Sequence, residues 1–159
     1  MTALTFSRSK LVGIEYLAPD TYLAHGVLDD YIYGLELEVE VKLPNFEIAR
    51  IEGKWKRYTT PECPKAVSTL QKAVGWCIFE EGFRRKVNRI IWREGCEHFA
   101  NLLLECCDAM RWCVLYGEWE ELKKEEVALD KEKYIGRKLE EIPSLQDSCI
   151  LCSGKIKGE

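Results

Sequence analysis

The stretch Gly95-Cys96-Glu97-His98 places a thiol, a carboxylate and an imidazole within four residues, and it holds one of the two histidines of the chain. Two residues apart within a helix, Cys96 and His98 would point about 200° away from each other. They converge to within about 4 Å only where Cys96 occupies the N-cap of a helix and His98 lies in its first turn. A thiolate beside an imidazole serves as a pair of metal ligands or as a nucleophile with its base. The alternative is that Cys96 only caps the helix and that His98 binds a backbone carbonyl.

Cys149 and Cys152 have the two-residue spacing of a zinc knuckle or of a redox dithiol. Such a pair needs two further ligands, and Cys96 with His98 would complete a set of three thiolates and one imidazole. Cys63 is the reserve ligand, because it also lies at the start of a predicted helix. We therefore expect a metal site formed by Cys96, His98, Cys149, Cys152 and Cys63, with zinc or iron as the ion. The alternative for the last two cysteines is a frayed terminus with ordinary thiols.

Charge is unevenly distributed along the chain. Seven acidic residues and no lysine or arginine lie between Gly13 and Val41, whereas five basic residues lie between Arg84 and Arg93. One interpretation is that sheet and helix surfaces complement one another, within a subunit or between subunits. The second is a groove for phosphate or carboxylate groups, with the basic helix supplying the ligand-binding residues Arg84, Arg85 and Arg89. Asp29-Asp30, at a strand end, could supply carboxylates to a site, but we interpret the pair as a solvated turn.

The first third of the chain predicts an antiparallel meander of four strands, over residues 10–17, 21–29, 35–43 and 46–58. In the third strand leucine and valine alternate with glutamate and lysine, which is typical of a sheet with one buried and one exposed face. In the fourth strand the apolar positions change from even to odd between Ile48 and Ile51. This change predicts a bulge near Ala49-Arg50.

The remainder of the chain shows helical spacing. Pro64 suits the first position of a helix that carries Val74 and Cys77 inward, and a second helix is expected over residues 82–93. A third begins at Cys96 or Glu97 and has one apolar stripe, made of Phe99, Leu102, Leu103, Cys106, Met110 and Val114. Residues 117–133 are helical and charged, and residues 142–152 are a candidate edge strand. The expected class is α+β, with an N-terminal antiparallel β meander packed against three or more C-terminal helices.

The length of 159 residues fits one domain over 1–159, mainly strands over about 10–58 and mainly helices over about 64–133. No apolar stretch approaches the roughly 20 residues that cross a bilayer. The net charge of −4 argues against binding to nucleic acid or to an anionic membrane. No export signal is visible, so the eight cysteines are expected to be free thiols in the reducing cytoplasm. Neither a glycine-rich phosphate loop nor a Ser-His-Asp order is visible.

Several short motifs occur in the order of a known family. They are Gly26-Val27-Leu28-Asp29-Asp30 before the alternating strand, Pro61-Glu62-Cys63-Pro64 before a helix, Gly95-Cys96-Glu97-His98 before the third helix, and the late Cys149. Over about residues 22–152 the chain resembles the bacterial domain-of-unknown-function (DUF) family 2889. Members often carry a histidine where this chain has Tyr33. The resemblance implies an architecture and a set of candidate residues, and it implies no reaction, because the family has none assigned.

Three classes of function remain. The first, which we favour, is a small accessory or binding protein with a metal or ligand site of cysteine and histidine. The second is a small enzyme in which Cys96 and His98 act as nucleophile and base or hold a catalytic metal. The third is an interaction domain whose charged arm over residues 118–133 binds a partner. A protein partner or a homo-oligomer is expected.

Overall fold

The computed structural model describes residues 5–124, 130–147 and 152–153. Four β-strands come first and helices follow, which is the α+β order expected from the sequence. The strands are β1 (Arg8–Ala18), β2 (Thr21–Asp30), β3 (Gly34–Lys42) and β4 (Glu47–Arg57). The helices are the 3₁₀-helix η1 (Cys63–Ala73), α1 (Phe83–Val87), the π-helix η2 (Asn88–Trp92), α2 (Glu97–Lys124), α3 (Lys131–Glu141) and the 3₁₀-helix η3 (Pro143–Leu145).

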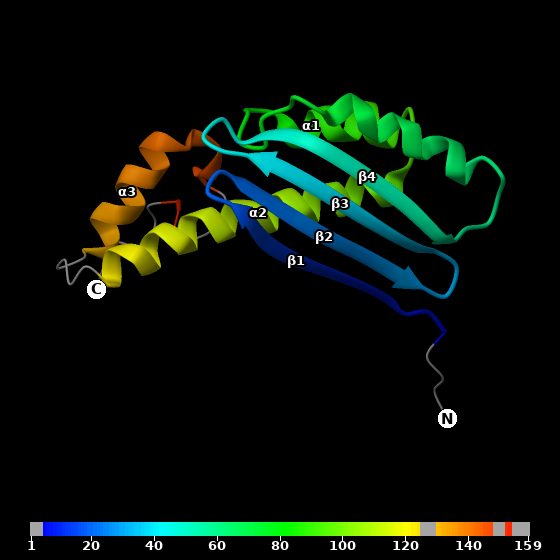
Figure 1. Cartoon of the computed structure of the whole chain (residues 1–159), viewed down its shortest axis with the longest axis horizontal. Helices are drawn as coiled ribbons and strands as arrows, with labels where there is room; N and C mark the ends of the chain where they lie inside the picture. Colours follow the sequence, from blue (N-terminus) through cyan, green and yellow to red (C-terminus); the bar gives the residue numbers. More distant parts are fainter. Residues whose placement is uncertain (1–4, 125–129, 148–151, 154–159) are drawn as a thin grey trace.

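The four strands form one antiparallel sheet in the order β1-β2-β3-β4. Helix α2 crosses behind all four strands, and α3 lies beside the C-terminal part of α2 (Figure 1). The helices therefore cover one face of the sheet and leave the other face open. None of the helices within the described residues is both long and apolar enough to span a membrane.

The alternation of β3 sets which face of the sheet is buried. Leu35, Leu37, Val39 and Val41 are all buried in the core, whereas the glutamates between them lie on the open face. The same alternation in β2 places Ala24 and Leu28 inward. The strand register predicted from the sequence is therefore confirmed.

Truncation of Val39 to alanine is expected to lower the free energy of unfolding by about 1–3 kcal/mol, because the side chain is completely buried and leaves a cavity. Urea unfolding of the variant and of the unmodified protein measures the difference. The matched control is Val27→Ala on the open face, where the side chain is 39% exposed. That change is expected to cost about 0.5 kcal/mol or less, and an equal loss in both variants would contradict this assignment of faces.

The predicted bulge lies in β4. Glu40 pairs with Arg50 and Val41 pairs with Ile48, so Ala49 is an extra residue with no partner in β3. Ile48 and Ile51 are both buried as a result, and Arg50 lies on the open face. The bulge expected from the apolar spacing is confirmed.

Helix α2 packs closely on the sheet because glycines face it. A β-carbon at Gly26 would lie 2.7 Å from Cys106 Sγ, and one at Gly53 would lie 2.7 Å from a ring carbon of Phe99. The predicted apolar stripe of α2 is buried along its full length, as Phe99, Leu102, Leu103, Cys106, Met110 and Val114. The first part of α2 is thus fixed against the middle of the sheet.

Four expectations about the other elements need correction. The segment that begins with Pro64 is a 3₁₀-helix rather than an α-helix, so it buries Leu70 and Ala73, which are three residues apart. Val74, expected to point inward, is exposed because Gly75, with φ +82°, ends the helix there. The helix over 82–93 exists, but its second half is the π-helix η2. No strand occurs in the described part of residues 142–152, where η3 is found instead.

Candidate functional site

Cys96 occupies the N-cap of α2, as predicted. Its carbonyl oxygen accepts the first helical hydrogen bond, from the Ala100 N–H at 3.0 Å. The backbone N–H groups of Phe99 and His98 are directed at its sulfur. Burial raises the pKa of the Cys96 thiol above its usual value and outweighs the opposite effect of these two N–H groups. The thiol is therefore mainly protonated at neutral pH.

His98 faces Cys96 across the first turn of the helix. Its Nδ1 atom lies 3.8 Å from Cys96 Sγ, so the predicted convergence of the two side chains is confirmed. The imidazole packs against Tyr33, with ring centroids 4.2 Å apart, and near Trp55, at 6.2 Å. Burial, together with the nearby Arg8 guanidinium, lowers the pKa of His98. The ring is therefore mainly neutral at neutral pH.

Arg8 and Asp30 extend this cluster from the sheet. Arg8 Nη2 lies 3.4 Å from His98 Nε2, and Arg8 Nε donates to Asp30 Oδ2 at 2.6 Å. The other carboxylate oxygen of Asp30 accepts the backbone N–H groups of Ile32 and Tyr33. Burial alone would raise the pKa of Asp30, but these N–H groups and Arg8 together hold it below its usual value. A continuous chain of contacts thus runs from Asp30 through Arg8 and His98 to Cys96.

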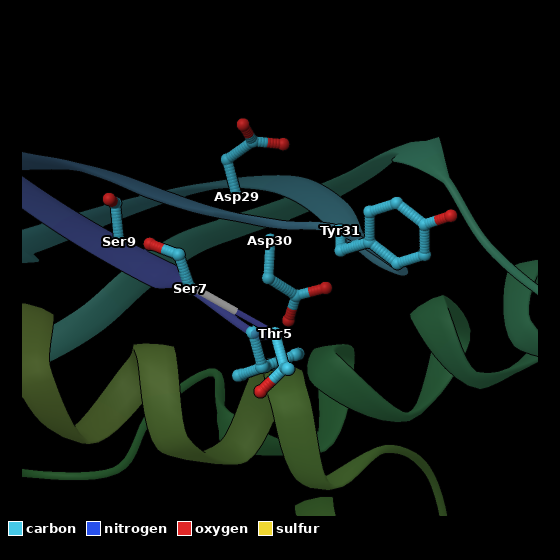
Figure 2. Close-up of a pocket in the computed structure, with 7 residues that line it drawn as sticks. Thr5, Ser7, Ser9, Asp29, Asp30 and Tyr31 are labelled. Atoms are coloured by element: carbon cyan, nitrogen blue, oxygen red, sulfur yellow. The ribbon is translucent and has the colours of Figure 1, made fainter. Parts of the chain in front are cut away.

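An open pocket of about 410 Å³ adjoins this chain of contacts. Figure 2 shows the Asp30 side chain directed from β2 toward the helices, whereas Asp29 points to the opposite side of the strand. The lining is rich in hydroxyl groups and consists of Thr5, Phe6, Ser7, Ser9, Asp29, Asp30 and Tyr31. The sequence interpretation of Asp29-Asp30 as a solvated turn is therefore wrong for Asp30, whose side chain is buried.

Cys63 lies near Cys96 and His98, but within the described residues its side chain makes no hydrogen bond to either of them. The indole N–H of Trp55 donates to the Cys63 carbonyl oxygen at 2.8 Å, and the same indole ring lies beside His98. Cys63 is close enough that its charge would raise the pKa of Cys96. Hydrogen bonding, first of all with the Thr60 hydroxyl, lowers the pKa of Cys63. Cys63 is thus the second thiol in this region of the fold.

Of the two other predicted ligands the structure describes only Cys152, and it does not bring Cys152 to this place. Cys149 lies outside the described residues. Cys152 is buried, and its carbonyl accepts the Asp147 N–H in the segment after η3. That segment lies at the opposite end of α2 from Cys96 (Figure 1). Within the described ranges, no three or more histidine, cysteine, aspartate or glutamate side chains form a group that could hold a metal ion.

The predicted anion-binding arginines form a separate surface on α1 and η2. Arg84 pairs with Asp108 at 3.0 Å, whereas Arg85 and Arg89 extend into solvent. None of the three lines the pocket beside Asp30. Their role in ligand binding stays a prediction.

The family model described as protein of unknown function (DUF2889) matches the chain over residues 15–111. This match covers more than half of the chain. The chain belongs to the DUF2889 family. The DUF2889 match includes Asp30, Cys63, Cys96 and His98, and it ends before the predicted ligands Cys149 and Cys152. No curated protein and no solved structure matched the chain.

Proposed function

We propose that the protein is a small accessory or binding protein that holds a soft metal ion at Cys96 and His98, with zinc as the first expectation and iron as the second. The observation that supports it is the 3.8 Å separation between Cys96 Sγ and His98 Nδ1 at the N-terminus of α2. Thiolate sulfur and imidazole nitrogen are the ligand types that zinc prefers. The free thiols would keep this capacity in a reducing compartment such as the cytoplasm.

The protonation states favour binding over nucleophilic catalysis. A nucleophile with its base works as a thiolate beside an imidazolium, so it needs a low thiol pKa and a high imidazole pKa. Burial raises the pKa of Cys96, while burial and Arg8 lower that of His98, which is the opposite arrangement. A metal cation needs no imidazolium, because it displaces the thiol proton and takes the lone pair of a neutral ring.

Arg8 controls which nitrogen of His98 is available. While its guanidinium donates to Nε2, the proton of the neutral ring stays on Nδ1. Binding of a cation through Nδ1 therefore requires Arg8 to release Nε2, and Asp30 retains Arg8 through its bond to Nε. Two ligands hold zinc only weakly, since structural sites use four. Cys63 is the candidate for a third position, because it is the other thiol that acts on Cys96, and Cys149, outside the described residues, stays a prediction.

Metal analysis of protein purified without chelator tests this proposal. We expect about one zinc ion per chain in the unmodified protein, and loss of most of it in Cys96→Ser and in His98→Gln. The matched control is Cys113→Ser, because Cys113 lies on α2 away from His98 and should leave the metal content unchanged.

Two other outcomes would overturn the proposal. If the protein is free of metal and Cys96 is alkylated slowly, Cys96 only caps α2 and is neither a metal ligand nor a nucleophile. Metal-free protein whose Cys96 is alkylated rapidly near neutral pH would instead support the enzyme with a cysteine nucleophile, because the thiolate is the reactive form.

A further inference from the structure

The open face of the sheet carries an acidic surface, which we define as Glu15, Glu38, Glu40 and Glu52 with His25 and Arg50 between them. Glu38 and Glu52 are directly opposite in neighbouring strands, an arrangement of like charges that destabilises a sheet. The Arg50 guanidinium alone contacts Glu38, Glu40 and Glu52, at 3.2, 3.2 and 2.9 Å. His25 lies between Glu15 and Glu38. These four carboxylates therefore share Arg50 as their one permanently charged partner among the described ion pairs, whereas Glu36, further along the face, pairs with Lys56.

An apolar pair borders this acidic surface. Leu11 of β1 and Val27 of β2 are directly opposite each other on the open face, and Leu11 is 71% exposed. They lie two residue pairs further along the strands than Gly13 and His25, and so come next on the same face of the sheet. The acidic surface thus has an apolar patch at its margin, the combination that interfaces use for an anchor with a polar rim.

The opposite charge is gathered on α1 and η2. Arg85, Arg89 and Arg93 are exposed and follow one another at intervals of four residues, so they form a stripe along this short helical segment. Within the part of the chain that the structure describes, no carboxylate pairs with any of the three. Trp92 is exposed beside them, at 42%. Arginine and tryptophan are the residue types most enriched among those that dominate binding energy at protein interfaces.

We propose that the acidic surface of one copy of this chain binds the arginine stripe and Trp92 of a second copy. The stripe cannot reach the acidic surface of its own chain, because Phe83, Val87 and Ile91 fix α1 and η2 in the helical layer behind the sheet. Opposite charges steer the two surfaces together, and Trp92 meets the apolar pair Leu11 and Val27. This contact is independent of the Cys96–His98 site.

Charge also selects this geometry over a symmetric one. Two acidic surfaces packed against each other would bring eight carboxylates together with only the two Arg50 guanidinium groups between them, and like charges placed opposite each other oppose binding. Binding of a face to a stripe leaves one free face and one free stripe at the ends of each assembly. Such a heterologous contact extends with concentration into a chain or closes into a ring.

Sedimentation velocity over a range of protein concentrations, at about 0.05 and 0.5 M salt, tests this contact. We expect the unmodified protein to associate, and the association constant to fall at least about tenfold at the higher salt concentration. Glu15→Lys/Glu52→Lys makes the face basic, and Arg85→Glu/Arg89→Glu makes the stripe acidic. Each double variant alone should be monomeric where the unmodified protein associates. The matched control Lys133→Glu, on α3, should associate normally.

The decisive sample is the mixture of the two double variants. Each then offers the charge that the other lacks, so mixed assemblies are expected to form at the concentrations where each variant alone is monomeric. Circular dichroism spectra that match the unmodified protein establish that both variants are folded. An unmodified protein that stays monomeric at every concentration would overturn the proposal, as would folded variants that stay monomeric when mixed or that associate as strongly as the unmodified protein.

Discussion

Replacing Phe99 with alanine is expected to lower the free energy of unfolding by about 3–5 kcal/mol, the range observed when a buried aromatic ring is removed from a core. Phe99 is completely buried and packs edge-on against Trp55, with ring centroids 5.1 Å apart. It also fills the space above Gly53, where no side chain can stand. Because Phe99 lies in the first turn of α2, its loss would loosen the same turn that holds Cys96 and His98.

Urea unfolding followed by circular dichroism measures this loss. Phe99→Leu keeps much of the apolar volume and should lose less than the alanine variant. Trp112→Ala on the same helix removes a larger side chain that is 54% exposed, so it should cost about 0.5 kcal/mol or less. If Phe99→Ala lost no more than Trp112→Ala, the packing of α2 against the sheet described above would be wrong.

Asp30→Ala is expected to lower the free energy of unfolding by about 3 kcal/mol at pH 7, because it leaves two partly buried N–H groups and one arginine without their acceptor. The side chain of Asp30 is fully buried, whereas that of Arg8 is 35% exposed, so solvent screens part of the ion pair. Most of the loss should therefore come from the N–H groups of Ile32 and Tyr33. Asp30→Asn retains one acceptor oxygen and should lose about half as much.

The effect of Asp30 should depend on pH. Folding lowers its pKa below the ordinary value of 3.8, so the carboxylate contributes its full stabilisation above that value. The contribution is then lost as the pH falls through the lower pKa of the folded state. Urea unfolding measures the free energy of unfolding of the unmodified protein and of Asp30→Asn at neutral and at acidic pH. The difference between the two proteins should become smaller at acidic pH. The matched control is Asp29→Asn, which alters an exposed neighbour that pairs with Arg57. If the free energy of unfolding lost in Asp29→Asn depended on pH as strongly as that lost in Asp30→Asn, the pH dependence could not be assigned to Asp30.

Much of the fold could be predicted because its determinants are local in the sequence. Alternation in β3 specifies the buried face, and the change of parity between Ile48 and Ile51 locates the bulge. The apolar stripe of α2 likewise follows from spacing alone. The helical type of η1 and η2 could not be predicted in this way, because the 3₁₀ and the π spacing each differ from the α spacing by less than one residue per turn. Tertiary packing decides among the three.

The candidate site could be predicted only where it is local. Cys96 and His98 converge because the N-cap geometry allows it, and both residues lie in one short motif. Arg8 joins them through the pairing of β1 with β2, which places Arg8 opposite Asp30 across a separation of 22 residues. The spacing of residues in the sequence does not indicate that Arg8 is a partner of His98, because the two are brought together only by the packing of the sheet on α2. The place of Cys152 could not be predicted for a related reason, because α2, α3 and η3 lie between it and Cys96 in the chain, and only their packing decides how close the two come.

The extra residue in β4 also bears on how the chain could change in length during evolution. Without Ala49, Ile48, Arg50 and Ile51 would alternate regularly, and each would keep its present side of the sheet. Loss of a residue elsewhere in the strand would invert every side chain between that point and the strand end. A relative with one residue fewer between positions 47 and 51 is therefore best aligned with its gap at Ala49. At this position a deletion would remove the bulge and its local twist while the buried and exposed sets stay intact.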